Sequence, residues 1–177
     1  MRVVAGVYGG RRLVAPPGDA TRPTSDRVRE ALFSVLGDAV GDARVLDLYA
    51  GSGALGIEAL SRGATAAVFV DRAPAAIKAI RANLDALGIE ASVHRMQARA
   101  ALRAAAVRSE AYDLVLLDPP YRHAAGLGRE LSEALPAVLA PGALVVTESD
   151  RRDPLVLQIQ LTDERRYGDT VIRIHGT

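Results

Sequence analysis

The sequence contains no cysteine and no tryptophan, and only three of its 177 residues are histidines. The absence of cysteine excludes disulfides, thiolate metal sites and a cysteine nucleophile. His94, His123 and His175 are too scattered to form a zinc site by themselves. No run approaches the roughly 20 apolar residues that a membrane span requires, and no charged-then-apolar leader opens the chain. We therefore expect a cytoplasmic protein with no membrane segment and no resident metal.

Positive charge is distributed unevenly along the chain. The formal net charge is only +1, but residues 1–29 contain six arginines against two aspartates. These arginines are Arg2, Arg11, Arg12, Arg22, Arg27 and Arg29. A basic segment on a nearly neutral body indicates a polyanionic partner that binds at one end of the molecule. A basic surface that contacts only solvent is the alternative.

The length of the chain suits a single domain with a substantial core. Residues 1–15 alternate short apolar runs with glycines, which predicts a β-hairpin with Arg11 and Arg12 at its tip. We therefore expect a basic β-hairpin extension over residues 1–20 and one catalytic domain over residues 21–177.

Beyond the extension, segments with the period of a helix alternate with segments typical of buried strands. Apolar residues at helical spacing from Val28 to Leu36 predict an amphipathic helix that ends at Gly37. The predicted strands cover 44–50, 67–71, 91–96, 112–117, 143–148, 155–161 and 170–175, and the other predicted helices cover 54–62, 74–87, 99–108 and 127–139. This order predicts an α/β fold with a mostly parallel, seven-stranded, Rossmann-like sheet, helices on both faces and a final antiparallel hairpin.

A glycine-rich turn links the first predicted strand of this sheet to a helix, in the sequence DLYAGSGALG from Asp47 to Gly56. Glycines let the backbone turn sharply and let a ligand approach without interference from a Cβ atom. Asp71 ends the next predicted strand, 20 residues after Gly51, where a carboxylate can bind both ribose hydroxyls of a nucleoside. The two features together predict a nucleoside ligand at the carboxyl edge of the sheet.

The six residues from Gly51 to Gly56 also match the dinucleotide fingerprint, so an NAD-dependent oxidoreductase is a rival interpretation. Asp47 argues against it, because a carboxylate facing the crevice would repel the NAD pyrophosphate by about 1 kcal/mol or more. S-adenosylmethionine carries an ammonium and a sulfonium group and no phosphate, so a carboxylate favours it. A structural acid that caps the loop is the alternative role for Asp47.

The most informative motif is Asp118-Pro119-Pro120-Tyr121, which directly follows the apolar strand 112–117. The prolines end the strand because they fix φ and lack N–H donors. The motif leaves a carboxylate, backbone carbonyls and an aromatic ring at the carboxyl end of the strand. Such a set can accept hydrogen bonds from an exocyclic amine while the ring stacks on the base. A polar turn without a ligand is the alternative.

These motifs, in this order and spacing, resemble the class I S-adenosylmethionine-dependent methyltransferases that modify exocyclic amines. More specifically, three segments resemble the RsmD family of 16S ribosomal RNA guanine-N2 methyltransferases: TRPTSDRVREALF from Thr21, GSGALGIEALSRGA from Gly51, and YGDT from Tyr167. The resemblance covers nearly the whole chain. It implies methyl transfer to the N2 amine of one guanine in the small ribosomal subunit or an assembly intermediate, by a protein that we expect to be monomeric.

The resemblance also assigns roles to individual residues. The expected S-adenosylmethionine contacts are Asp47, Tyr49, Ala50, Gly51, Ser52, Gly53, Asp71, Arg72, Gln97, Ala98 and Thr24. Gln97 stands where many class I enzymes place an acid near the adenine amine, and its amide oxygen can accept the same bond. The expected catalytic residues are Asp118, Pro119, Pro120 and Tyr121.

The remaining assignments concern RNA. We expect Arg2, Arg11 and Arg12 to hold the phosphate backbone, and Arg22 and Arg27 to contact the substrate. Arg22, Thr24 and Arg27 flank either the methionine carboxylate or the target nucleotide. Two rival functions stay open: an adenine-N6 DNA methyltransferase, which also uses the D-P-P-Y motif, and a non-catalytic ribosome-assembly factor that retains a cofactor site.

Overall fold

The computed structural model of this chain describes residues 1–17, 25–119 and 124–176. Four predicted site residues lie outside these ranges and receive no structural account: Arg22, Thr24, Pro120 and Tyr121. Within the described ranges, no helix is both long and apolar enough to cross a membrane.

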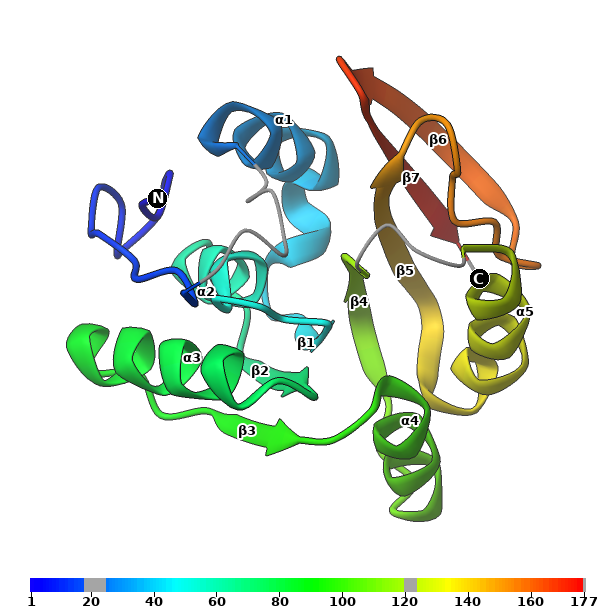
Figure 1. Ribbon diagram of the computed structural model, residues 1–177, viewed down its shortest axis with the longest axis horizontal. Coiled ribbons are helices and arrows are strands. Elements are labelled where there is room, and N and C mark those ends of the chain that lie inside the picture. The colour runs from blue at the N-terminus through cyan, green and yellow to red at the C-terminus, as the bar shows by residue number, and fades with distance from the viewer. Residues whose placement is uncertain (18–24, 120–123, 177) are drawn as a thin grey trace.

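A single seven-stranded sheet forms the centre of the molecule, with strand order β3-β2-β1-β4-β5-β7-β6 (Figure 1). Strands β1 to β5 run parallel, and β7 runs antiparallel to both of its neighbours. The strands are β1 Arg44–Leu48, β2 Ala66–Asp71, β3 Ser92–Arg95, β4 Tyr112–Leu117, β5 Leu139–Asp150, β6 Leu161–Tyr167 and β7 Thr170–Gly176. The predicted mostly parallel, seven-stranded α/β fold is confirmed.

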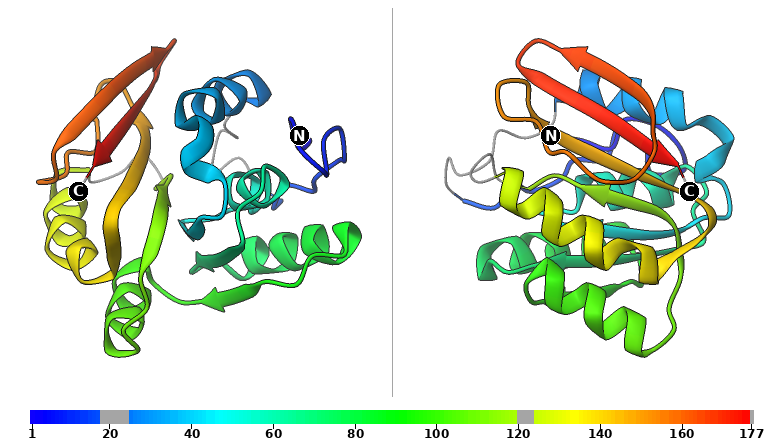
Figure 2. Two further views of the ribbon diagram at one scale, coloured as in Figure 1. Left: turned by 180° about the vertical axis from the view of Figure 1, so that it is seen from behind. Right: turned by 90° about the vertical axis from the view of Figure 1, so that its right-hand side faces the viewer.

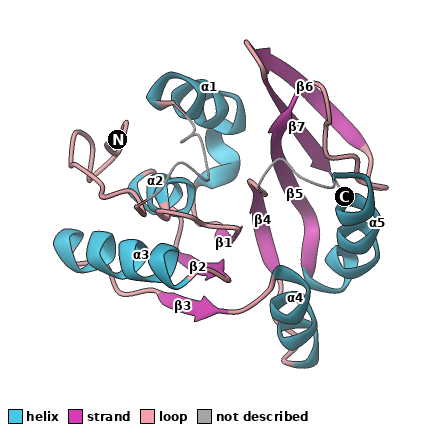
Figure 3. Cartoon of the chain, in the orientation of Figure 1, coloured by secondary structure: helices cyan, strands magenta, loops and turns pink. Residues whose placement is uncertain are grey.

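Helices cover both faces of this sheet (Figure 3). The described helices are α1 Asp26–Leu36, α2 Ala54–Ser61, α3 Pro74–Leu87, α4 Ala98–Val107 and α5 Ala124–Ala134, with 3₁₀ turns at Gly37–Val40 and Leu135–Val138. Helices α1, α2 and α3 lie on one face, and α4 and α5 lie on the other. Alternate strand residues supply the two cores, as a pleated sheet requires: Val45 packs on the first face and Leu46 on the second.

Sequence signals for the helix ends are largely confirmed. The Ser25 hydroxyl accepts the Val28 N–H at the start of α1, and Gly37 caps its end. Pro74 occupies the first turn of α3, where its missing N–H has no helical partner to lose, and Gly88 ends that helix in the left-handed conformation. The predicted helix 127–139 instead begins at Ala124 and passes into the 3₁₀ turn, and the next strand is longer than expected.

The predicted strand over 155–161 is wrong. Strand β6 begins at Leu161, and residues 154–160 form an irregular segment that covers the sheet. Leu155 and Leu157 are buried while Val156 between them is exposed, so the alternating pattern reflects packing of a loop rather than a strand. Strand β6 itself is an exposed, charged edge strand, TDERRY after Leu161, so it lacks the apolar signal of a buried strand.

The first 14 residues, which we call the arm, double back on themselves but form only one isolated antiparallel bridge, Arg2 to Arg12. The turn lies at residues 5–10, so Arg11 and Arg12 are on the returning side and not at the tip. Val3 and Leu13 are buried in the core on the α1–α3 face. The arm therefore packs against the body, at the opposite end of the molecule from the β6–β7 hairpin (Figure 2).

Candidate active site

The candidate site lies where the chain changes direction across the sheet. Strands β1 and β4 are neighbours, with Leu48 opposite Leu117. From β1 the chain continues to β2 on one side, and from β4 it continues to β5 on the other. Open α/β sheets bind ligands at such a switch point, outside the carboxyl ends of the strands. Both predicted motifs, the glycine turn after β1 and Asp118-Pro119 after β4, lie there.

The loop after β1 adopts backbone angles that explain its composition. Tyr49, Gly51 and Gly53 all have positive φ, at 63°, 57° and 79°. Gly53 is the N-cap of α2, and its N–H donates to the Ala50 carbonyl at 2.6 Å. The Ala50 N–H in turn donates to the Val70 carbonyl of β2 at 3.0 Å. The turn is therefore held tightly enough to present its backbone at the edge of the sheet.

Gly56 completes the motif by allowing α2 to approach the sheet closely. A Cβ atom at this position would lie 2.4 Å from Phe69 Cε1 and 3.0 Å from Asp47 Oδ2. The Gly56 N–H donates to the same Asp47 oxygen at 2.9 Å. This glycine is needed for the packing of helix on strand rather than for contact with a ligand.

Asp47 does not face an open crevice, as we expected when weighing it against NAD. Its side chain is buried beneath the loop, where it caps the first turn of α2. Burial raises the pKa of Asp47 from 3.8 to about 7, against the lowering effect of the Gly56 N–H and with a smaller raising effect of the Asp71 charge. The structural role of Asp47 is thus evident, and its direct contact with a cofactor stays a prediction.

Asp71 is the more accessible of the two acids. It ends β2 and is half-buried. Its Oδ2 accepts the Gly51 N–H at 2.9 Å and its Oδ1 accepts the Ala73 N–H at 2.8 Å. An ionised carboxylate has about four lone-pair sites, so two backbone donors leave it able to accept ribose hydroxyls.

A buried amide from α3 supports the middle of the glycine loop, and the sequence reasoning missed it. Asn83 Nδ2 donates to the Ser52 carbonyl at 2.9 Å, and the Ser52 hydroxyl lies 3.4 Å from Met1 Sδ. The signal was present, because Asn83 interrupts the apolar face that Ile80 and Leu84 define on α3. A polar residue on the buried face of a helix must find hydrogen-bond partners.

Other predicted cofactor residues line the same edge. The Met96 N–H donates to the Asp71 carbonyl at 3.1 Å, so the start of α4 lies next to the end of β2. Gln97, which precedes this helix, is exposed, and Ala98, its first residue, is buried. Tyr49 is half-buried. Burial and, to a smaller extent, the Glu130 charge raise the pKa of Tyr49 to about 12, against the lowering effect of the Arg72 charge.

At the end of β4, Asp118 is half-buried and Pro119 is buried. Both directly follow Leu117, whose neighbour across the sheet is Leu48, three residues before Gly51. A carboxylate and a proline carbonyl therefore stand next to the glycine loop. The rest of the motif lies outside the described residues.

The predicted RNA residues separate into two groups. Arg12 and Arg27 are exposed. Arg2 is exposed but pairs with Asp26 at 3.3 Å, and Arg11 Nη2 donates to the Ala86 carbonyl near the end of α3 at 3.1 Å. Two of the arm arginines thus also hold the arm to the body.

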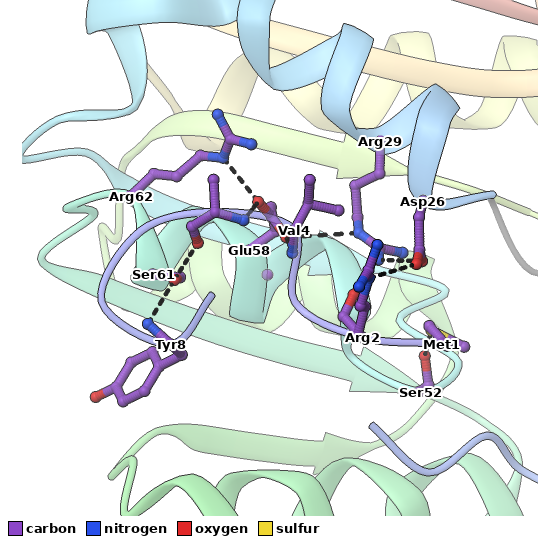
Figure 4. Close-up of polar contacts among 12 residues, drawn as sticks. Met1, Arg2, Val4, Tyr8, Asp26, Arg29, Ser52, Glu58, Ser61 and Arg62 are labelled. Carbon is purple, nitrogen blue, oxygen red and sulfur yellow. Dashed lines mark hydrogen bonds and ion pairs between the residues drawn. The ribbon is translucent and has the colours of Figure 1, made fainter. Parts of the chain in front are cut away.

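A charged cluster around the buried side chains of Glu58 and Arg29 is a second feature that sequence reasoning missed (Figure 4). Glu58 of α2 accepts the backbone N–H groups of Val4 and Ala5 at 2.7 and 3.0 Å, and it pairs with Arg62 at 2.8 Å. Arg29 of α1 lies 3.6 Å from Glu58 and 2.9 Å from Asp26. We call Arg2, Asp26, Arg29, Glu58 and Arg62 the arm cluster. Arg29 therefore serves the fold, although it stood among the basic residues that suggested a polyanionic partner.

In the part of the chain that the structure describes, no three histidine, cysteine, aspartate or glutamate side chains are grouped as a metal site.

Residues 1–176 match the protein family described as "Conserved hypothetical protein 95". The chain belongs to this family. YlbH of Bacillus subtilis is 40% identical over 99% of this chain and 98% of its own length. Ribosomal RNA small subunit methyltransferase D of Escherichia coli is 38% identical, over 85% of this chain and 75% of its own length. The resemblance to the RsmD family and the enzyme class, methyltransferase, are confirmed.

A more distant solved structure confirms the fold. The 16S rRNA N2 G1207 methyltransferase of Thermus thermophilus, in complex with AdoMet and guanosine, matches with a TM-score of 0.69 over 92% of this chain and 45% of that chain, at 22% identity. The class I methyltransferase fold is therefore shared.

Proposed function

We propose that this protein transfers a methyl group from S-adenosylmethionine to the exocyclic N2 amine of a guanine in small-subunit ribosomal RNA. The observation that carries the proposal is the placement of Asp118 and Pro119 directly beside the glycine loop, through the pairing of Leu48 with Leu117. An amine acceptor and a cofactor loop thus share one crevice. The curated relative from Escherichia coli carries a name that states the same substrate class.

The loop fits S-adenosylmethionine. Among the residues that the structure describes, a Cβ atom added to Gly51 would meet only the Tyr49 carbonyl, at 3.9 Å, which leaves room for a ligand beside the loop backbone. The Asp71 carboxylate stands at the adjacent strand end to accept ribose hydroxyls, and Gln97 stands near the expected adenine position. A cationic ligand would favour the ionised form of the buried Asp47 carboxyl, whose pKa is raised to about 7, and a pyrophosphate would oppose it. When bound, the cofactor supplies an electrophilic methyl group on a sulfonium.

The target amine is a poor nucleophile because its lone pair is delocalised into the base, and the residues after β4 can make it more nucleophilic. The Asp118 carboxylate and the Pro119 carbonyl accept its two N–H groups and favour a pyramidal nitrogen with its lone pair directed at the methyl group. Tyr121 stacks on the base, which contributes about 1–3 kcal/mol. Positioning and electrostatics then account for most of the rate enhancement.

RNA contact at the arm is the second part of the proposal. Arg12 and Arg27 are exposed, and Arg2 remains largely exposed despite its ion pair. Residues 1–20 form the RNA-contacting extension and residues 21–177 form the catalytic domain, in a monomer that acts on the small subunit in the cytoplasm. Because phosphate contacts release counterions, binding should weaken steeply as salt is raised.

Substitution at Asp118 tests the catalytic assignment. Asp118→Ala should lower turnover by about 10²-fold or more, because an acceptor aimed at the reacting amine is lost. Its affinity for S-adenosylhomocysteine, measured by titration calorimetry, should stay within a few fold of that of the native protein. Asp113→Ala is the matched control, because Asp113 lies on the same strand, is exposed and accepts the Arg44 N–H at 2.8 Å. Near-native turnover of Asp118→Ala would overturn the assignment.

The substrate is tested with labelled S-adenosylmethionine and three acceptors: small subunits from cells lacking the gene, naked ribosomal RNA and unmethylated DNA. Nucleoside mass spectrometry should detect N2-methylguanosine from the subunits. N6-methyladenine from DNA would move the function to the DNA methyltransferase. Cofactor binding without any product would favour the assembly-factor interpretation.

A further inference from the structure

Asn83 is a buried polar residue that joins two functional segments. It lies on α3, is only 1% exposed, and neighbours the buried Ile80 and Leu84. Its Oδ1 accepts the Val14 N–H at 2.7 Å, and its Nδ2 donates both to the Val14 carbonyl at 2.9 Å and to the Ser52 carbonyl at 2.9 Å. One side-chain amide thus bonds to the end of the arm and to the centre of the glycine loop.

The arm depends on this amide through its backbone. The Val14 side chain is 61% exposed, so its backbone N–H and carbonyl groups, bonded to Asn83, hold this end of the arm together with the buried side chain of Leu13. The opposite end of the arm reaches the same loop residue, because Met1 Sδ lies 3.4 Å from the Ser52 hydroxyl. Ser52 is therefore contacted by the first residue of the arm and, through Asn83, by its last.

We infer that Asn83 is a positioning residue that couples the arm to the cofactor loop. A ligand that fixes Ser52 holds the Asn83 amide in place, and this amide in turn fixes Val14. A shift of the loop would separate these groups, and a buried donor or acceptor left without its partner costs about 1–3 kcal/mol. The coupling is reciprocal, so RNA on the arm strengthens cofactor binding and the cofactor restrains the arm. The effect of RNA on cofactor binding depends on the proposed function, whereas the effect of the cofactor on the arm does not.

Hydrogen exchange tests the coupling without any RNA. In the native protein, a saturating concentration of S-adenosylhomocysteine should slow exchange of the Val14 amide and of peptides from residues 1–14 by fivefold or more. Unchanged exchange in the native protein would overturn the inference, whatever the variants do. A purely structural hydrogen bond would leave these rates insensitive to the cofactor.

The variant Asn83→Leu removes all three bonds while keeping the number and branching of the side-chain heavy atoms, and it should abolish the effect of S-adenosylhomocysteine on the arm. Arg11→Ala is the matched control, because it removes another contact between the arm and α3, the bond to the Ala86 carbonyl, without reaching the loop. It should keep the protection by S-adenosylhomocysteine. Equal loss of protection in both variants would show general loosening of the arm and would contradict a specific role for Asn83.

Linkage to RNA is measured by equilibrium dialysis of labelled S-adenosylhomocysteine, with and without small subunits that lack the methyl group. The subunits should tighten binding about fivefold or more in the native protein, and less than twofold in Asn83→Leu. An unchanged factor in Asn83→Leu would overturn the inference. If the subunits do not bind the native protein at all, the proposed function fails, and the exchange experiment still decides the coupling within the protein.

Discussion

The arm and the β6–β7 hairpin are both excursions near the ends of the chain, and both carry ion pairs, but the pairs differ in their surroundings. In the arm cluster, the side chains of Glu58 and Arg29 are 0% exposed. In the hairpin, Glu164 pairs with Arg166 and Arg173 at 2.8 Å, and its side chain is 23% exposed. A further hairpin pair, Asp163 with Arg165, is also open to solvent.

This difference decides what the two sets of charges do. Glu58 satisfies two backbone N–H groups of the arm as well as two arginines, so its loss would leave several buried groups without a partner. The ion pairs of the hairpin join residues that are two apart on β6 or that face each other on β6 and β7. Water screens these pairs. Charges there keep an exposed edge strand from pairing with another chain. Ion pairs of the same chemistry thus hold the arm to α1 and α2 at one end and line an exposed edge strand at the other.

Removing the central carboxylate of each cluster is the strongest test of this comparison. Glu58→Gln should lower the free energy of unfolding by about 3–5 kcal/mol, since it leaves the Arg29 charge buried with a weaker partner. The melting temperature should fall by roughly 10 °C. Glu164→Gln is the matched control and should change it by less than about 2 °C. Similar shifts in both variants, measured by calorimetry, would refute the contrast.

The loop beside the arm should lose stability as pH rises. Burial raises the pKa of Asp47 to about 7 in the folded state, against 3.8 for the solvent-exposed carboxyl of the unfolded chain, so the folded protein binds more protons between these values. Its contribution therefore falls as pH rises from about 4 to about 7, by on the order of 4 kcal/mol. Asp47→Asn should remove this slope while keeping an acceptor for the Gly56 N–H. Urea unfolding at pH 5 and pH 7.5 measures this change in the free energy of unfolding. The same change in Asp47→Asn as in the native protein would contradict the raised pKa of Asp47.

Glycines with positive φ provide a finer test of how closely each region packs. Gly6, at φ +82°, would place a Cβ atom 1.8 Å from the Ser61 carbonyl oxygen, whereas Gly168 in the hairpin turn, at φ +62°, has nothing within 4 Å. Gly6→Ala should cost about 3 kcal/mol, because the arm turn must leave α2. Gly168→Ala should cost about 1 kcal/mol for the left-handed backbone alone.

Gly10 offers a control for Gly6 inside the arm itself. It has the same φ of +82° but nothing within 4 Å of an added Cβ atom. Gly10→Ala should therefore resemble Gly168→Ala in chemical denaturation. If it matched Gly6→Ala instead, backbone strain rather than contact with α2 would explain the loss.

The hairpin should respond to pH in the opposite direction from the loop. Burial lowers the pKa of His175 below 6.5, and the Arg173 charge lowers it further, while the Ile159 carbonyl raises it. The folded state then binds fewer protons, so the contribution of His175 is present above pH 6.5 and is lost as pH falls below it. In the His175→Asn variant, the free energy of unfolding should fall less steeply as pH drops below 6.5. An unchanged fall of this free energy in acid, measured by urea unfolding, would exclude this role.

Local signals predicted the elements well where burial and capping agree with the sequence. The helix Pro74–Leu87 and the strand Tyr112–Leu117 were predicted to the residue, because a proline, a glycine and a continuous apolar run mark their ends. The prediction failed at 155–161, where alternating apolar residues belong to a loop that packs on the sheet. It also misplaced the tip of the arm at Arg11 and Arg12, because the turn spans residues 5–10 and already contains Gly6, Gly9 and Gly10.

The sequence by itself determined the class of fold, the family and the position of the two site motifs, because periodicity, turn residues and the D-P-P-Y motif act over short stretches of chain. Tertiary structure alone decided what individual polar residues do. Asp47 caps α2 from below, Arg29 is sequestered beside Glu58, and Asn83 bonds to residues 31 and 69 positions away. Such roles depend on which backbone groups burial leaves without water, and only the packed chain specifies that.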